Sequence, residues 1–126
     1  MGRALIRRLW LWTPVLVWAG LIFYFSSIPH LKTDLGIGDI LLRKAAHMVE
    51  YGVLALLVFR ALQGTSQPAL PRAHWWSLGA ALLYAVTDEW HQAFVPGRGP
   101  SALDVGFDGA GAFLALWIRR RLWFFG

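Results

Sequence analysis

The sequence contains no cysteine, which excludes disulfide bonds and thiolate metal sites and leaves the redox compartment undetermined. Charged residues are scarce as well, at 15% of the chain, against about a quarter in an average soluble domain. Hydrophobic residues make up 57% of the 126 residues, and eight residues are Trp. A chain of this length and polarity is too apolar for a small soluble domain, so we expect a single membrane-embedded domain over residues 1–126.

Acidic residues are absent from long parts of the chain. All seven lie within or beside three of the apolar segments, or in the loop before the first of these three: Asp34, Asp39, Glu50, Asp88, Glu89, Asp104 and Asp108. Ionisable groups inside apolar segments are costly, so a chain that keeps several usually uses them. The chemistry is therefore expected in one polar cluster at one face of a membrane.

The apolar segments predict an all-α membrane protein with four transmembrane helices in an up-down-up-down bundle. The expected spans are about 10–28, 40–62, 75–95 and 102–123, with prolines at the breaks. The first span is about 28 Å long as a helix, close to the thickness of a bilayer core. A signal peptide is the alternative for this basic-then-apolar start. The apolar run is too long for one, however, and no small-residue cleavage site follows.

The basic residues indicate the orientation. With four spans, one side of the membrane carries both termini and eight arginines without an acid, whereas the other side carries four cations and all seven acids. The resulting charges are +8 and −3. The positive-inside rule then predicts a multi-pass protein of the inner (cytoplasmic) membrane with both termini in the cytoplasm. Because the cations flank the spans instead of sharing one helix face, we expect membrane lipids and not nucleic acid as partners.

Polar residues of the second span share two overlapping helical stripes. Lys44, His47 and Tyr51 form one stripe, and Arg43, His47 and Glu50 form the other. His47 is expected about 10 Å inside the start of the helix. A neutral imidazole at that depth is a candidate general base or metal ligand. The alternative is a packed histidine bonded to a carboxylate.

Polar residues of the third span gather near its end, at the outer leaflet. Asp88, His91 and Gln92 share a face, and Glu89 points about 100° away. Two adjacent carboxylates in a membrane invite a shared proton or a cation partner. Either carboxylate is therefore a candidate acid–base group or an anchor for a cationic group, and the alternative is a buried ion pair with a nearby arginine or lysine.

The segment before the fourth span frames Arg98 between two glycines and two prolines. Such an arginine suits a phosphate or carboxylate ligand, or else bridges to an acid of the third span. Ser101 and Asp104 match a capping box, which is the favoured interpretation of this pair. Asp108 lies one turn further in, without a capping role. Three glycines nearby keep the span narrow, for close helix approach or to leave room for a ligand.

Three patterns in the chain resemble the VanZ-like family of small bacterial membrane proteins. They are Ser26-Ser27-x-Pro29, then Arg43-Lys44-x-x-His47-x-x-Glu50-Tyr51, and a long pattern that runs from Asp88-Glu89-x-x-Gln92 through Pro96-Gly97-Arg98, Ser101, Asp104 and Asp108 to Gly111-Ala112. Many members carry Asp at position 43, Asn at 108 and Gly at 115. The resemblance implies a four-span membrane protein with a shared polar site. Because the family is named for a protein linked to teicoplanin resistance, it also implies a possible connection to glycopeptide resistance.

These observations predict a site at the outer leaflet that binds or acts on an anionic, lipid-linked cell-envelope molecule. The candidate catalytic residues are His47, Glu89, Asp104 and Asp108; the candidate substrate-binding residues are Arg43, Lys44, Tyr51, Gln92, Arg98 and Ser101; and the rest of the expected cluster is Ser26, Ser27, Glu50, Asp88 and His91. Whether a reaction is catalysed stays open, because neither Ser27 nor Ser101 has an obvious histidine partner in the sequence to activate it as a nucleophile.

Three alternatives remain. The first is a non-catalytic accessory protein whose polar cluster is an ion-pair network or a recognition patch for a partner. The second is a metal-dependent hydrolase, although no H-E-x-x-H or comparable spacing occurs, so neither a metal nor another cofactor is expected. The third is a proton pathway, which the near absence of polar groups in the cytoplasmic halves of the spans disfavours.

Overall fold

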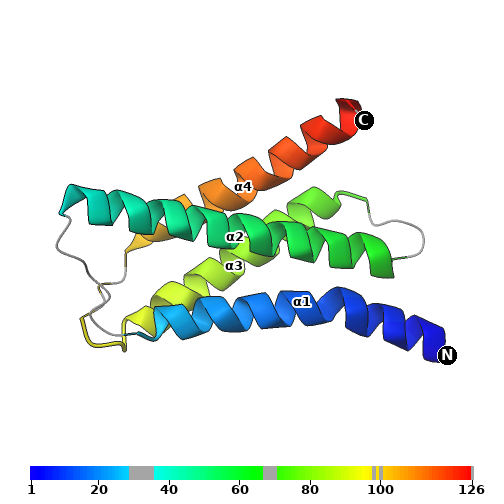
Figure 1. The fold of residues 1–126 in the computed structure, drawn as a ribbon, viewed down its shortest axis with the longest axis horizontal. Helices are drawn as coiled ribbons and strands as arrows, with labels where there is room; N and C mark the ends of the chain where they lie inside the picture. Colours follow the sequence, from blue (N-terminus) through cyan, green and yellow to red (C-terminus); the bar gives the residue numbers. More distant parts are fainter. Residues whose placement is uncertain (29–35, 67–70, 98, 100, 126) are drawn as a thin grey trace.

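The computed structural model describes residues 1–28, 36–66, 71–97, 99 and 101–125, and these residues form four helices. The helices are α1 (Gly2–Ser26), α2 (Ile37–Thr65), α3 (Ala73–Gln92) and α4 (Ala102–Phe125). Figure 1 shows that successive helices run in alternating directions. The polar end is the end where α1 and α3 finish and α2 and α4 begin; the opposite end, where the N-terminus lies and α4 finishes, is the arginine end. The predicted all-α class is confirmed.

The helices depart from the predicted spans mostly by starting earlier. α1 begins at Gly2 and not near Trp10, and α2 begins at Ile37 and not near Ile40. Hydropathy marks only the apolar part of a helix, whereas Leu, Ala and Arg continue it because their helix propensity is high. His47 therefore lies about 15 Å from the start of α2, deeper than the expected 10 Å or so.

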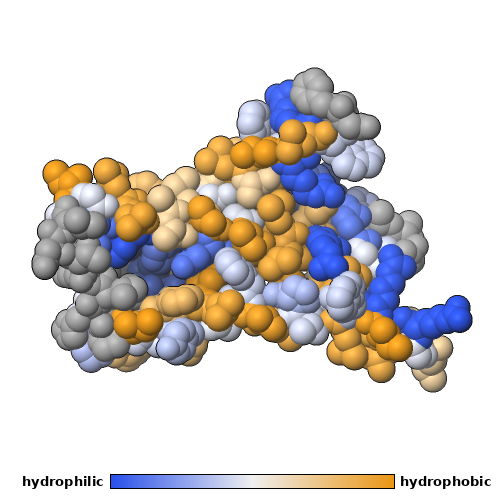
Figure 2. All heavy atoms as spheres, in the orientation of Figure 1, coloured by the Kyte–Doolittle hydropathy of each residue, from blue (hydrophilic) through white to orange (hydrophobic). Residues whose placement is uncertain are grey.

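Two of the described helices, α1 and α2, are long and apolar enough to cross a membrane. Their apolar side chains also cover much of the outer surface. Large hydrophobic residues such as Leu16, Val17, Leu83, Val86 and Ile118 are exposed. Figure 2 shows that hydrophilic residues gather at the two ends of the molecule, with a hydrophobic region between them. A surface of this kind suits contact with lipid better than contact with water.

Helix α2 is central, because it packs against each of the other three helices. α4 packs against α2 and α3, and no contact between α1 and α4 occurs among the described residues. Small residues bring α2 and α4 together. A Cβ atom on Gly111 would lie 2.5 Å from the Met48 Cα, and one on Gly52 would lie 3.2 Å from the Ala115 Cβ. Of the two predicted uses of glycine in α4, Gly111 therefore serves close helix approach.

The apolar core has two parts, each centred on α2. On the α1 side, Leu11, Val15 and Ile22 pack with Tyr51, Leu54, Val58, Ala61 and Ala85. On the α4 side, Ala55 and Phe59 pack with Ala73, Ala81, Ala112 and Leu116. Tyr51, at 0% exposure, ends the first part at the polar end. The core therefore fixes the depth and direction of the polar side chains just beyond it.

Candidate functional site

Side chains from all four helices meet at the polar end. The polar cluster, as we use the term below, consists of Ser26, Asp39, Arg43, Lys44, His47, Tyr51, Asp88, Glu89, Gln92, Asp104 and Asp108. Figure 2 shows hydrophilic residues in a hollow at this end of the molecule, beside the first turns of α2. The convergence expected from sequence is therefore present in the structure.

Two interhelical pairs connect α2 with α4. The Lys44 ammonium pairs with Asp104, and Nδ1 of His47 lies 3.1 Å from Oδ1 of Asp108. Both pairs form because α2 and α4 run in the same direction, so that residues about one turn apart on one helix face residues one turn apart on the other. Asp108 is 1% exposed. The Lys44 Nζ also lies 5.3 Å from the centroid of the Phe107 ring, which restricts its position.

A third ion pair lies within α2. Nε of Arg43 is 3.1 Å from Oδ2 of Asp39, one helical turn earlier. The Asp39 side chain is buried, whereas the Arg43 and Lys44 side chains are each about a third exposed. The two cations therefore reach solvent at the mouth of the cluster, with their carboxylate partners behind them.

Asp88 joins α3 to α1. Its Oδ2 accepts hydrogen bonds from the Ser26 hydroxyl at 2.7 Å and from Nε2 of Gln92 at 3.4 Å. The Gln92 amide also donates to the Ser26 hydroxyl at 3.3 Å. All three side chains are buried. Asp88 is therefore held by neutral donors and not by an ion pair, unlike the acids of α4.

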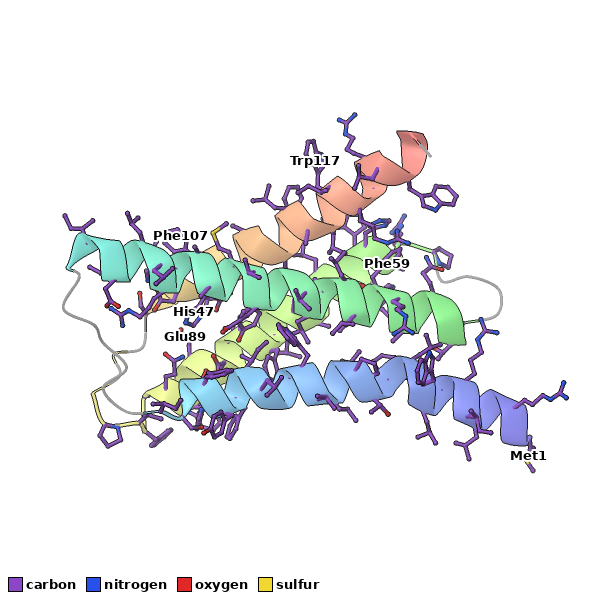
Figure 3. All side chains as sticks on the ribbon, in the orientation of Figure 1. Met1, His47, Phe59, Glu89, Phe107 and Trp117 are labelled. Carbon is purple, nitrogen blue, oxygen red and sulfur yellow. The ribbon has the colours of Figure 1, made fainter. Side chains whose placement is uncertain are left out.

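Glu89 points to the other side of α3, as its position in the helix predicts. Figure 3 shows it extending toward His47 on α2. Its Oε2 accepts a 2.8 Å hydrogen bond from the backbone N–H of Ser101, just before α4. In a capping box, Asp104 would accept the hydrogen bond from the N–H of Ser101. Here Glu89 accepts that hydrogen bond instead.

The predicted capping box is therefore only half formed. The Ser101 hydroxyl accepts a 3.2 Å hydrogen bond from the N–H of Leu103, so Ser101 does cap α4. Asp104, however, pairs with Lys44 and does not return to the Ser101 N–H. A carboxylate gains more from an ammonium group than from a neutral amide, which is the physical reason for the difference.

Of the remaining candidates, Ser27, His91 and Glu50 lie near the cluster. The Ser27 hydroxyl donates to the Phe23 carbonyl at 2.8 Å and lies 3.5 Å from Nε2 of His91, whose ring stacks on Phe23. Glu50 is half-buried on α2, and its carbonyl accepts a hydrogen bond from the Trp18 indole. Arg98 lies outside the described residues.

Two buried carboxylate oxygens of the cluster have no hydrogen-bond partner among the described residues. They are Oε1 of Glu89 and Oδ2 of Asp108. Buried polar atoms are nearly always satisfied by protein, water or ligand. Because carboxylate oxygens only accept, both atoms would be satisfied by hydrogen-bond donors.

A cavity of about 300 Å³ opens at the polar end. Its walls come from α2, the end of α3, the segment before α4 and the first turn of α4: Ile40, Arg43, Lys44, His47, Gln92, Gly97, Gly99 and Asp104. Asp108 holds Nδ1 of His47, so proton exchange with a bound molecule would use the other nitrogen, Nε2. The cavity thus presents two cations, one imidazole, one amide and the Asp104 carboxylate to a ligand.

The described residues contain no group of three His, Cys, Asp or Glu side chains arranged to hold a metal ion. The carboxylates are near one another in sequence but are distributed among partners on different helices. Asp88 accepts a hydrogen bond from Ser26, Asp104 pairs with Lys44, and Asp108 pairs with His47.

Sequence reasoning missed two contributors. Asp39 was recognised as an acid but not as a site residue, although its i, i+4 spacing to Arg43 is a salt-bridge pattern. Tyr84 donates a 2.5 Å hydrogen bond to the Ala19 carbonyl, and its ring centroid lies 6.2 Å from that of Tyr51. No local pattern marks Tyr84, because its partner lies 65 positions away on α1.

Two apolar helices of membrane-spanning length, with ionisable groups buried at one end of the bundle, are typical of a helical membrane protein. The model of the VanZ/LLP1 family matches residues 11–124, so the chain belongs to this family. Neither a curated protein nor a solved structure matches the chain.

Proposed function

We propose that the polar end binds the headgroup of an anionic, lipid-linked cell-envelope molecule. The observation that carries this proposal is the cavity lined by Arg43, Lys44 and His47, at the end of helices that are apolar elsewhere. A phosphate or carboxylate group of the ligand would lie at the two partly exposed cations, where it competes with Asp39 and Asp104.

The polar groups that line the cavity beside the two cations support a ligand that also carries hydrogen-bond donors. Hydroxyl or amino groups of a sugar or amino acid would donate to Asp104, while the Gln92 amide lines the cavity and orients the headgroup. If the bound molecule is a cell-envelope precursor, the link to teicoplanin resistance implied by the family resemblance would follow.

Binding is the core of the proposal, and catalysis is not part of it. His47 and Asp108 form the pairing of an imidazole with an orienting carboxylate that general bases require. Of the described serines at the cluster, however, Ser26 donates to Asp88, Ser27 lies beside His91 and Ser101 caps α4, so none of them is paired with His47. Asp104 is held by Lys44, which leaves His47 and Glu89 as the candidates for proton transfer.

The membrane arrangement that belongs to this proposal is a single domain with four spans in the inner membrane, both termini in the cytoplasm and the polar end at the outer leaflet. The alternating helix directions and the arginines at one end support it. Since the chain has no cysteine, His30→Cys and Ser66→Cys each give a single labelling site. An impermeant thiol reagent applied outside intact cells should label position 30. Labelling of position 66 alone would reverse the orientation.

A second candidate function is favoured by the ion pairs between α2 and α4. In this reading the cluster is a structural network of an accessory protein, without a ligand. Buried pairs of this kind often contribute little net stability, but removing one partner is strongly destabilising. The two functions therefore differ in what Lys44 does: it either binds a ligand or only holds Asp104.

The test compares a polyprenyl phosphate with the polyprenol of the same chain length, using the purified protein in detergent. We expect the phosphate to bind at least tenfold more tightly, which is about 1.4 kcal/mol. Lys44→Met, which keeps the length of the side chain without its charge, should remove this preference. Gln63→Glu, on the other end of α2, is the matched control and should keep it. Equal binding of the two lipids by the wild type, with large destabilisation by Lys44→Met, would favour the structural network.

A further inference from the structure

The arginine end has the opposite charge pattern to the polar end. The sequence contains no acid in residues 51–87 or 109–126, although Arg60, Arg72 and Arg119–Arg121 lie there. All three salt bridges between described residues lie at the polar end. Within the described part of the chain, the arginines of this end therefore have no carboxylate partner.

A groove opens between α2 and α4 at this end. The two helices approach closely at Gly52 and Gly111, and Figure 1 shows α4 diverging from α2 toward its C-terminus. The groove has a volume of about 1180 Å³. Its walls are apolar except for two arginines: Leu56, Arg60, Ala115, Ile118, Arg119, Leu122 and Trp123.

The two arginines of the groove are placed differently. The Arg119 guanidinium lies 4.0 Å from the ring centroid of Phe59, which is 3% exposed, so this cation is held against the core. Arg60 is exposed and also lines a second hollow of about 380 Å³ against α1, beside Leu9, Trp10 and Pro14. A negatively charged group at Arg60 would therefore lie where two apolar hollows meet.

This combination of shape and charge fits one kind of occupant. In a membrane, an apolar groove that is open to the side is filled by acyl chains, and arginines at its end reach the depth of the phosphates. Guanidinium groups bind phosphate oxygens in bidentate fashion. A second copy of the chain would fit poorly, because it would bring further unpaired arginines against Arg60 and Arg119.

We propose that the groove between α2 and α4 binds an anionic phospholipid of the surrounding leaflet. One acyl chain lies along the apolar wall that contains Leu56 and Ile118, and the phosphate lies at Arg60 and Arg119. This site requires that the protein lies in a membrane, but it does not require the function proposed for the polar cluster.

The experiment is native mass spectrometry of the full chain with phosphatidylglycerol and, separately, with phosphatidylcholine of the same acyl chains. Phosphatidylglycerol should bind more tightly, and Arg60→Gln or Arg119→Gln should each weaken its binding about fivefold. Arg3→Gln removes the same charge from α1 at the same end, outside both hollows, and should leave the affinity unchanged. Ile118→Trp should weaken binding by filling the groove while both arginines stay.

Five results would overturn the proposal. Equal affinity for the two lipids would show that the charge of the headgroup plays no role. If Arg3→Gln weakened phosphatidylglycerol binding as much as Arg60→Gln does, the preference would reflect the general positive charge of this end and not the groove. Unchanged binding in Ile118→Trp, or equally tight binding of glycerol phosphate, would remove the role of the groove. A lipid-free dimer that Ile118→Trp dissociates would assign the groove to a second copy. Thermal unfolding of each variant checks that it is folded.

Discussion

The two ends of the molecule differ in how their positively charged side chains are paired. At the polar end, each described cation has a carboxylate partner, and most of the described acids are buried: Asp108 is 1% exposed and Asp88 is 3% exposed. At the arginine end, cations lie on or near the surface without acids. A charge inside the bundle must be matched by the protein itself, whereas a charge at the headgroup level can be matched by lipid phosphates. The same residue type is therefore paired with carboxylates at one end and has no acidic partner among the described residues at the other.

Removing a buried acid should produce the largest effect. Asp108→Ala leaves His47 without its partner, and we expect a loss of about 3–5 kcal/mol in the free energy of unfolding. Unfolding by denaturant in a fixed detergent measures this loss. The double variant with His47→Ala should lose less than the sum of the two single variants, because the two groups interact. Strict additivity would show that the pair does not stabilise the fold.

Forcing α2 and α4 apart at their closest contact should produce the second-largest loss in the free energy of unfolding. A methyl group on Gly111 collides with the backbone at Met48, so Gly111→Ala should lower the free energy of unfolding by about 1–3 kcal/mol. Gly106→Ala is the matched control on the same helix, because its Cβ would meet nothing within 4 Å. It should be neutral, or stabilising by up to about 1 kcal/mol from helix propensity. Equal effects would contradict the close approach at Gly111.

Substitutions of two adjacent serines allow the effect of losing a buried hydrogen bond to be compared with that of losing an exposed one. Ser26→Ala deprives Asp88 of a donor at 2.7 Å and should be destabilising by about 1–3 kcal/mol. Ser27 bonds only a carbonyl of its own helix and lies 3.5 Å from His91, so Ser27→Ala should change stability by about 0.5 kcal/mol or less. The thermal midpoints of the two variants provide the comparison, and a larger shift for Ser27→Ala would reverse the assignment.

Arginine substitutions should produce the smallest effects on stability. Arg119→Gln loses the contact with Phe59 and should be destabilising by about 0.5–1 kcal/mol in detergent. Arg3→Gln should change the free energy of unfolding by about 0.5 kcal/mol or less. If either change approached that of Asp108→Ala, the contrast between the two ends would be wrong.

The sequence predicted the all-α class and the convergence of polar residues, because both depend on hydropathy and on simple helix periodicity. It also placed Asp88 and Glu89 on different faces, which the structure shows as contacts with Ser26 and Ser101. The sequence could not predict which side chains pair between helices. The preference of Asp104 for Lys44 over a capping role depends on the register of α2 against α4, which the close contact at Gly111 helps to set.

The cavities could not be predicted for a related reason. Periodicity shows which residues share a face of one helix, but a groove exists only where two helices separate. The approach of α4 to α2 at Gly52 and its divergence beyond Phe59 are properties of the pair. Arg60 and Arg119 therefore read as ordinary flanking arginines in the sequence, and as the polar end of an apolar groove in the structure.

The distribution of polarity among the helices also follows their order of synthesis. α1 and α2 are made first, and they are the described helices that are long and apolar enough to cross a membrane. Asp88 of α3 and Asp104 and Asp108 of α4 follow later in the chain, and their partners Ser26, Lys44 and His47 are on the earlier pair. When α3 and α4 are made, the partners of these three carboxylates therefore already exist on the first two helices.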